Sequence, residues 1–369
     1  MRIHNRFVGG NIRVSAVIGI NVYLDQEFRD KFTWWFYWAF CVEEAQGQTL
    51  TFHFCNSDVV GYWGPAVSHD NVNYAWAGKQ DRIDGATFRY TFGADESRVF
   101  FCYALPYHYT NYENWLRKQT APIQTDVFCV SERGRNVPCF TVGNQNAANT
   151  ILFTSRHHAC ESMATWALEA ATDECIRLSD ALKKMDCNLL VVPFVDFDGV
   201  QDGDQGKNRA PHDQNRDYIE DGAIFAVNRT LMQLPKKKNV IAFVDFHDPW
   251  YLGDVNDYLC LIRELKGVHH LTDDFAANLQ VTTAKNAGSD DIVYRGEHDL
   301  FPGDVDWVAI KQNPVTSTAF WRRNNIRMAQ SIEIPYFGTP DFEYNTKNVK
   351  TLGKNIADAL LMTLGAEID

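Results

Sequence analysis

The sequence predicts a small antiparallel β-sandwich domain over residues 1–115, followed by an α/β domain over residues 116–369. The α/β domain is expected to hold a mixed, largely parallel sheet flanked by helices. Short runs of alternating apolar and polar residues fill the first third, which is typical of sandwich strands. After about residue 115, apolar runs alternate with helix-like runs, which is typical of parallel sheets. A chain of 369 residues is long enough for both domains.

Several runs in the first third indicate strands. Every second residue of the segment 12–24 is apolar, so these residues should share one side of a strand. Residues 33–42 are strongly aromatic, and residues 50–54 and 88–92 alternate between aromatic or apolar and polar side chains. A further apolar run follows at residues 99–104. The simplest role for these aromatic side chains is packing in the core of the sandwich.

The second part of the sequence has the pattern of strands joined by helices. Three short apolar runs indicate buried strands, at residues 151–154, 188–195 and 239–246. Two helix-like runs follow the first two strands, at residues 161–184 and near residues 219–234. The segment 345–365 has the spacing of a closing amphipathic helix.

Composition excludes several classes of partner. The formal net charge is −12, whereas nucleic-acid binding needs a basic surface. The nine cysteines are scattered and include no Cys-x-x-Cys pair, which disfavours a thiolate zinc site and favours free thiols in a reducing cytosol. The start of the chain lacks a signal-peptide core, and no apolar run approaches the length of a membrane span. We therefore expect a cytoplasmic protein that binds neither nucleic acid nor membrane.

The most informative polar residues follow the predicted strand 151–154. His158 and Glu161 stand three residues apart between this strand and the next helix, so both side chains can point to one spot. Imidazole nitrogen and carboxylate oxygen are both zinc ligands. His247, at the end of a later strand, can complete the site and leave one position open for water, as catalytic zinc requires.

The predicted topology brings these segments to one edge of the sheet. His158, Asp196 and His247 each follow or end a predicted parallel strand, and ligands bind beyond the carboxyl ends of such strands. Asp245 and Asp248 flank His247 and are candidates to accept a hydrogen bond from its ring, which would fix its tautomer.

The polar loop between residues 198 and 216 is rich in Asp and Gly. A helix-loop-helix calcium site is disfavoured, because the distal bidentate Glu is missing. The loop's Arg209 and Arg216 instead suggest carboxylate recognition through the planar guanidinium. Glu333 lies between two isoleucines on a strand-like run; such a Glu either faces solvent or, if it points inward, is costly unless it is paired or functional.

In their order along the chain, these motifs resemble the zinc metallocarboxypeptidases, and most closely their cytosolic branch. The order is His-x-x-Glu, then Asp-Gly with a following Arg, then Asn-Arg, then a strand-end His, then a strand Glu. The segment 34–115 also resembles that branch's small β-sandwich domain, and residues 318–322 resemble the stretch that precedes its strand Glu. The resemblance implies one Zn²⁺ per chain, bound by His158, Glu161 and His247. Since His157 precedes the first of these, it is a second candidate for that ligand position.

The resemblance also implies roles for the remaining residues. Glu333 would be the general base that activates water and then protonates the leaving amine. Arg209 would stabilise the oxyanion, and Asn215 with Arg216 would bind the free C-terminal carboxylate. The implied activity is hydrolysis of the C-terminal peptide or isopeptide bond of a peptide or protein.

Two alternatives remain open. A zinc amidohydrolase that acts on small N-acyl amino acids would share the zinc ligands and arginines, but such enzymes generally lack an aromatic N-terminal sandwich. A non-catalytic zinc-binding module of the same fold would be expected to have lost Glu333 or a zinc ligand, and all four residues are present.

Overall fold

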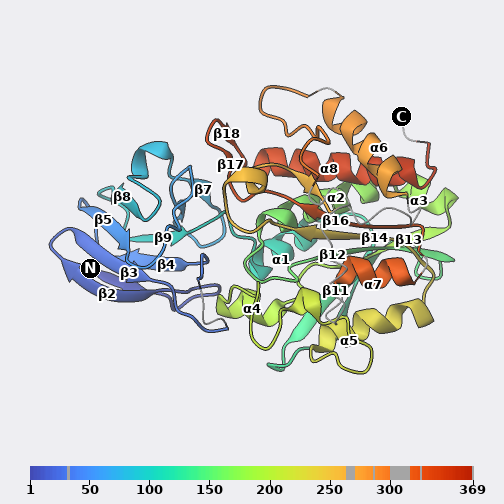
Figure 1. Cartoon of the computed structure of the whole chain (residues 1–369), viewed down its shortest axis with the longest axis horizontal. Helices are drawn as coiled ribbons and strands as arrows, with labels where there is room; N and C mark the ends of the chain where they lie inside the picture. The colour runs from blue at the N-terminus through green and yellow to red at the C-terminus, as the bar shows by residue number, and fades with distance from the viewer. Residues whose placement is uncertain (31–33, 263–270, 286, 300–315, 325, 368–369) are drawn as a thin grey trace.

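The computed structural model describes residues 1–30, 34–262, 271–285, 287–299, 316–324 and 326–367. Two small sheets form at the N-terminus and lie beside a larger part in which one central sheet is flanked by helices (Figure 1). The predicted fold class is thereby confirmed.

The N-terminal part consists of two sheets. One has the strand order β1-β4-β9-β6-β7 and the other β2-β3-β5-β8. Neighbouring strands are antiparallel except for β3 and β5, which run parallel because the chain passes through β4 of the other sheet between them. The strand bounds are β1 Arg2–His4, β2 Arg13–Ile18, β3 Asn21–Asp25, β4 Ala39–Glu43, β5 Thr49–Phe54, β6 Ala66–Ser68, β7 Ala75–Trp76, β8 Thr87–Thr91 and β9 Arg98–Cys102.

The prediction that the alternating residues of segment 12–24 share one side of a strand is wrong. The chain reverses after β2 and returns as β3, and a register shift interrupts their pairing between Val14 and Ala16. Ile18 and Ile20, at the reversal, are 64% and 54% exposed, whereas Val22 and Leu24 on β3 are fully buried. Alternation along a sequence does not reveal a hairpin turn that lacks an Asn-Gly signal.

The aromatic residues of the N-terminal part form its core, as predicted. Phe52 and Phe88 stack with their ring centroids 4.7 Å apart, and Phe40 stacks on Phe101 at 5.2 Å. All four side chains are fully buried, as is Trp38. In the predicted run 33–42, Thr33 lies outside the described residues, and strand structure begins at Ala39 with β4.

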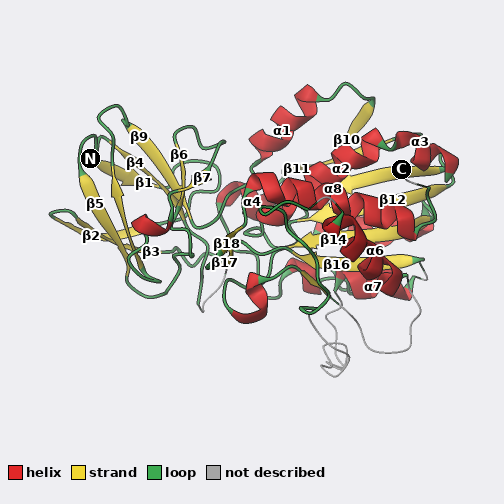
Figure 2. Cartoon of the chain, turned by 90° about the horizontal axis from the view of Figure 1, so that it is seen from above, coloured by secondary structure: helices red, strands yellow, loops and turns green. Residues whose placement is uncertain are grey.

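The central sheet has seven strands in the order β10-β11-β13-β12-β14-β16-β15. Strands β13, β12, β14 and β16 are parallel neighbours. The strands at the two edges, β10 with β11 and β15, pair antiparallel with their neighbours. The strand bounds are β10 Ile123–Val130, β11 Asn136–Val142, β12 Asn149–Ser155, β13 Cys187–Val192, β14 Val240–His247, β15 Cys260–Leu261 and β16 Met328–Glu333. Figure 2 shows β12, β14 and β16 side by side.

Helices cover both faces of this sheet. In Figure 1, α6 and α8 lie on one side of it and α5 and α7 on the other. The helix predicted at 161–184 is divided into α2 and α3, and the closing helix predicted at 345–365 is α8, whose first turn is capped by the side chain of Asn345. The helix bounds are α1 Tyr109–Lys118, α2 Met163–Arg177, α3 Ser179–Lys184, α4 Phe197–Asp202, α5 Ala226–Gln233, α6 Thr272–Ala284, α7 Ser317–Arg323 and α8 Thr346–Thr363.

The chain continues from the first part to the second through a helix rather than through an exposed linker. Helix α1 runs across the predicted domain boundary between residues 115 and 116. Two indole N–H groups then connect the parts: Trp63 donates to the carbonyl oxygen of Phe337 at 2.9 Å, and Trp76 to that of Tyr344 at 2.8 Å. These acceptors flank the small hairpin of β17 (Gly338–Thr339) and β18 (Phe342–Glu343).

Among the described residues, each helix is too short or too polar to cross a lipid bilayer. All nine cysteines are free, as predicted.

Candidate active site

Three parallel neighbouring strands bring the predicted metal ligands and the predicted base to the same edge of the central sheet. His158 and Glu161 lie in the loop that follows β12, His247 ends β14, and Glu333 ends β16. His247 and Glu333 are paired across β14 and β16. This edge lies beyond the carboxyl ends of the parallel strands, where open α/β sheets bind their ligands.

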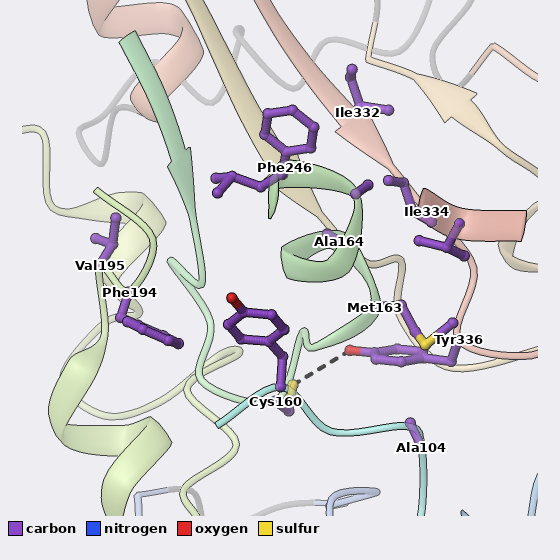
Figure 3. Packing of buried hydrophobic residues seen from close by; sticks show 14 of the residues in the cluster. Ala104, Cys160, Met163, Ala164, Phe194, Val195, Phe246, Ile332, Ile334 and Tyr336 are labelled. Atoms are coloured by element: carbon purple, nitrogen blue, oxygen red, sulfur yellow. Dashed lines mark hydrogen bonds between the residues drawn. The ribbon is translucent and has the colours of Figure 1, made fainter. Parts of the chain in front are cut away.

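Strand alternation explains why these side chains face the site. Phe246, Ile332 and Ile334 precede or follow His247 and Glu333 in the sequence, and all three are fully buried. Figure 3 shows them among the buried hydrophobic residues. Since successive strand residues point to opposite faces, His247 and Glu333 point the other way.

The candidate metal group consists of His158, Glu161 and His247, whose side chains converge on one point. The Glu161 carboxylate lies between the two imidazoles, with Oε1 2.6 Å from His158 Nδ1 and Oε2 2.7 Å from His247 Nδ1. One ligand atom from each residue lies within 4.8 Å of the others. All three side chains are buried. Two imidazole nitrogens and a carboxylate form the donor set of a three-ligand catalytic zinc site.

Further carboxylates lie behind both imidazoles. Asp213 Oδ1 is 3.5 Å from His158 Nε2, and Asp245 Oδ2 is 2.8 Å from His247 Nε2. The contact of His247 is a hydrogen bond, which fixes the tautomer of a metal-binding histidine and orients its ring, whereas the longer contact of His158 is an ion-pair distance only. The expected role of Asp245 as an acceptor from His247 is confirmed. Asp248 instead accepts hydrogen bonds from the backbone N–H groups of Met163 and Ala164 at the start of α2.

A second possible metal group shares His247 and consists of His157, Asp245 and His247. Both ring nitrogens of His157 already have partners: Nδ1 lies 2.9 Å from Asp245 Oδ1, and Nε2 lies 2.7 Å from the Tyr218 hydroxyl. His157 is also fully buried, whereas His158 is slightly exposed. A catalytic metal needs an open position, so the geometry favours His158 over His157 as the ligand.

Glu333 has the surroundings of a proton acceptor. Its Oε2 is buried and has no hydrogen-bond partner among the described residues. Burial raises the pKa of Glu333, while the neighbouring charges of His247 and Lys207 act in the opposite direction. A carboxyl group whose pKa is shifted toward neutrality is suited to take up and release a proton.

Asn215 and Arg216 lie at the side of the metal group, in the short 3₁₀ turn Gln214–Arg216. The Asn215 side chain accepts a hydrogen bond from Ser317 N at 2.9 Å, and its Nδ2 lies 3.4 Å from His247 Nε2. The partly buried Arg216 donates to the carbonyl oxygen of Asn215 at 3.0 Å. Among the described residues, no carboxylate forms an ion pair with its guanidinium.

Arg209 forms ion pairs with three carboxylates other than Glu161. Its Nη2 lies 2.8 Å from Asp30 Oδ2, 2.7 Å from Asp196 Oδ2 and 3.7 Å from Asp204 Oδ2. Asp196 lies at the expected edge, since its backbone N–H donates to the carbonyl oxygen of Arg156 at 2.7 Å, but its carboxylate pairs with Arg209. In addition, the Asp196 side chain caps α4 by accepting from Gly199 N.

Lys207 is the cation that the structure places at the metal group, and it was missed in the sequence. Its Nζ lies 2.6 Å from Glu161 Oε1. Burial would lower the pKa of Lys207, but the charges of Glu161 and Glu333 raise it to about 12. Its signal in the sequence is weak, because it is a single lysine two positions before Arg209 in a polar loop.

The loop that carries the ligands, residues 156–162, is held by the chain segment 103–107. Tyr103 donates its hydroxyl to the carbonyl oxygen of Cys160 at 3.0 Å, and Ser162 Oγ donates to that of Leu105 at 2.9 Å. Arg156 has a positive φ of 61°, and its buried guanidinium donates to the carbonyl oxygen of Tyr107 at 2.9 Å. Figure 3 shows the buried thiol of Cys160 beside the Tyr336 hydroxyl, 3.5 Å away.

Neither a family model nor a curated protein sequence matches this chain. Several solved structures, in contrast, match this chain. A metallo-carboxypeptidase from Burkholderia cenocepacia matches with a TM-score of 0.77 at 17% sequence identity, over 98% of each chain. A metallo-carboxypeptidase from Pseudomonas aeruginosa, in complex with (2-guanidinoethylmercapto)succinic acid, matches with a TM-score of 0.74 at 19% identity, over 99% of each chain.

This chain has the metallo-carboxypeptidase fold. The match extends over both the N-terminal sheets and the α/β part, since nearly all of each chain is covered. At this level of identity the likeness establishes the fold, and the chemistry depends on the side chains described above.

Proposed function

We propose that this protein is a zinc-dependent metallocarboxypeptidase that hydrolyses the C-terminal peptide or isopeptide bond of a peptide or protein. The observation that carries the proposal is the meeting of His158, Glu161 and His247 at one point, with the half-buried Glu333 paired to His247 on the neighbouring strand. One Zn²⁺ per chain would be held by the two Nδ1 atoms and the Glu161 carboxylate. When bound, zinc supplies a Lewis acid and lowers the pKa of a coordinated water to about 7.

Glu333 is the proposed general base. Its buried oxygen without a partner can take a proton from the attacking water and deliver it to the nitrogen of the leaving amine. The position of Glu333 directly across from His247 keeps this carboxylate beside the metal group throughout both transfers.

Asn215 and Arg216 are the proposed binding site for the substrate's terminal carboxylate. Arg216 makes no ion pair with any described carboxylate. Its planar guanidinium can therefore donate two parallel hydrogen bonds to the carboxylate of a substrate. The Asn215 amide beside His247 places this carboxylate next to the metal group. A site that requires a terminal carboxylate makes the enzyme an exopeptidase.

The test uses the whole protein loaded with zinc. We expect release of single C-terminal residues from free-acid peptides and much slower release from the same peptides with amidated C-termini. Peptides that differ only in the last residue would then define the preferred side chain. Cleavage of N-acyl amino acids but not of peptides would assign the amidohydrolase activity instead. Zinc binding without turnover of either substrate would assign a non-catalytic module.

A further inference from the structure

We propose that Lys207, and not Arg209, supplies the positive charge that stabilises the oxyanion in this reaction. The inference rests on the proposed function and concerns which residue of this chain performs one step of it.

Lys207 is held in place by the chain that follows His247. Its Nζ donates to the carbonyl oxygens of Asp248 and Pro249, each at 2.9 Å. A lysine ammonium has three donors. Two of them are used by these carbonyls, and the third is directed to the metal group, where Nζ lies 2.6 Å from Glu161 Oε1. The ammonium is thus fixed before substrate arrives, which is the condition for efficient charge stabilisation.

The surroundings of Lys207 strengthen its effect. The side chain is only 13% exposed, and its partner Glu161 is fully buried. A charge acts more strongly where water is excluded, because the local dielectric constant is lower. A flexible, solvated lysine would contribute far less.

Arg209 is unsuited to this role because its guanidinium is already held by other carboxylates. Its guanidinium is paired with the three carboxylates of Asp30, Asp196 and Asp204, and its Nε also donates to Asp30 at 2.9 Å. Three carboxylates thus surround its single charge, whereas the ion pair of Lys207 in the described part of the chain is with one carboxylate, Glu161. None of the ion-pair partners of Arg209 in the described part of the chain belongs to the metal group.

Lys207 would act in the step that forms the tetrahedral intermediate. As the water oxygen bonds to the carbonyl carbon, the electron pair of the C=O double bond moves onto the carbonyl oxygen, and Glu333 takes a proton from the water. Lys207 stabilises the negative charge on that oxygen. When the C–N bond breaks, the electron pair returns to re-form the C=O bond, and the nitrogen takes the proton from Glu333. Loss of one such donor typically lowers kcat by about 100- to 1000-fold.

The experiment compares Lys207→Met with Lys207→Gln, which removes the charge but can still donate to the two carbonyls. Lys236→Met, at an exposed lysine, is the control. Four quantities are measured: zinc content, kcat/KM on a free-acid peptide, inhibition by a phosphonate peptide that mimics the tetrahedral oxyanion, and inhibition by the released C-terminal amino acid.

We expect both Lys207 variants to keep stoichiometric zinc and to lose about 100- to 1000-fold in kcat/KM. Phosphonate affinity should fall by the same factor, whereas affinity for the released amino acid should change by less than about threefold, since that product has no oxygen at the former scissile carbonyl. A merely structural role would weaken both inhibitors equally.

Several results would overturn the proposal. One is a folded Lys207 variant with activity within about fivefold of wild type. Another is loss of zinc from both variants, because Lys207 would then serve metal retention. If the zinc-loaded wild type cleaves no peptide, the proposed function itself fails, and the role of Lys207 falls with it.

Discussion

Replacing Arg216 by Gln tests whether this protein recognises a free C-terminus. Arg216 donates one hydrogen bond to the carbonyl of Asn215, and no carboxylate of the described residues forms an ion pair with it. A guanidinium has five donors, so its remaining N–H groups can bind a substrate carboxylate. The variant keeps a polar side chain of similar shape but removes the charge and the planar fork.

The expected loss follows from this geometry. Each hydrogen bond to a charged group contributes about 1.5–3 kcal/mol, and a bidentate pair would contribute about 3–6 kcal/mol. Because Arg216 is only partly buried, solvent screening reduces the figure to about 3–4 kcal/mol. At about 1.4 kcal/mol for each factor of ten, kcat/KM on free-acid peptides should fall by about 100- to 1000-fold.

The assay measures kcat/KM for one peptide with a free and with an amidated C-terminus. Arg216→Gln should affect the amidated peptide by less than about threefold, since that peptide offers no carboxylate to bind. Arg229→Gln, on α5 with its exposed ion pair to Glu132, is the matched control and should leave both values near wild type. Equal losses on the two peptides would refute carboxylate binding by Arg216.

Three further predictions concern the base, the ligands and the helix packing. Glu333→Gln should bind zinc normally and lose about 100- to 10,000-fold in kcat, measured under saturating substrate. His158→Gln should purify without zinc whereas His157→Gln should retain it, as metal analysis after dialysis would determine. Gly353→Ala would place a Cβ 2.2 Å from the carbonyl oxygen of Ala167 and should destabilise the fold by about 1–3 kcal/mol in denaturant titration.

A different result would contradict each of these three predictions. Activity of Glu333→Gln within tenfold of wild type would remove it from the base role. Zinc loss only from the His157 variant would assign the metal to the other group. Gly288→Ala is the control for the glycine, because its Cβ would meet only the Asp291 side chain, at 3.5 Å. Equal stability changes in the two glycine variants would contradict the packing argument.

The metal group could be predicted from the sequence because each of its members ends or follows a recognisable apolar run. Parallel strands that end at one edge bring such residues together whatever the details of the loops. His158, Glu161 and His247 are such residues, and the structure places them within coordination reach of one another.

The cation could not be predicted in the same way. Arg209 and Lys207 are two residues apart in a polar loop, so spacing does not distinguish them. Their difference depends on Asp30, which comes from the N-terminal part and pairs with Arg209 in three dimensions. Likewise, the segment 12–24 has the alternation of one buried strand, and only the chain reversal places Ile18 and Ile20 in solvent.

The contacts of the loop 156–162 bear on how this protein can be shortened. Its shape depends on a tyrosine hydroxyl and two main-chain oxygens that lie 49 to 57 residues upstream. A fragment that starts after residue 108 would lose these partners and expose the buried Arg156 guanidinium. The segment 103–107, which follows the last strand of the N-terminal sheets, therefore belongs structurally to the α/β part, and any shortened form of the chain must retain it.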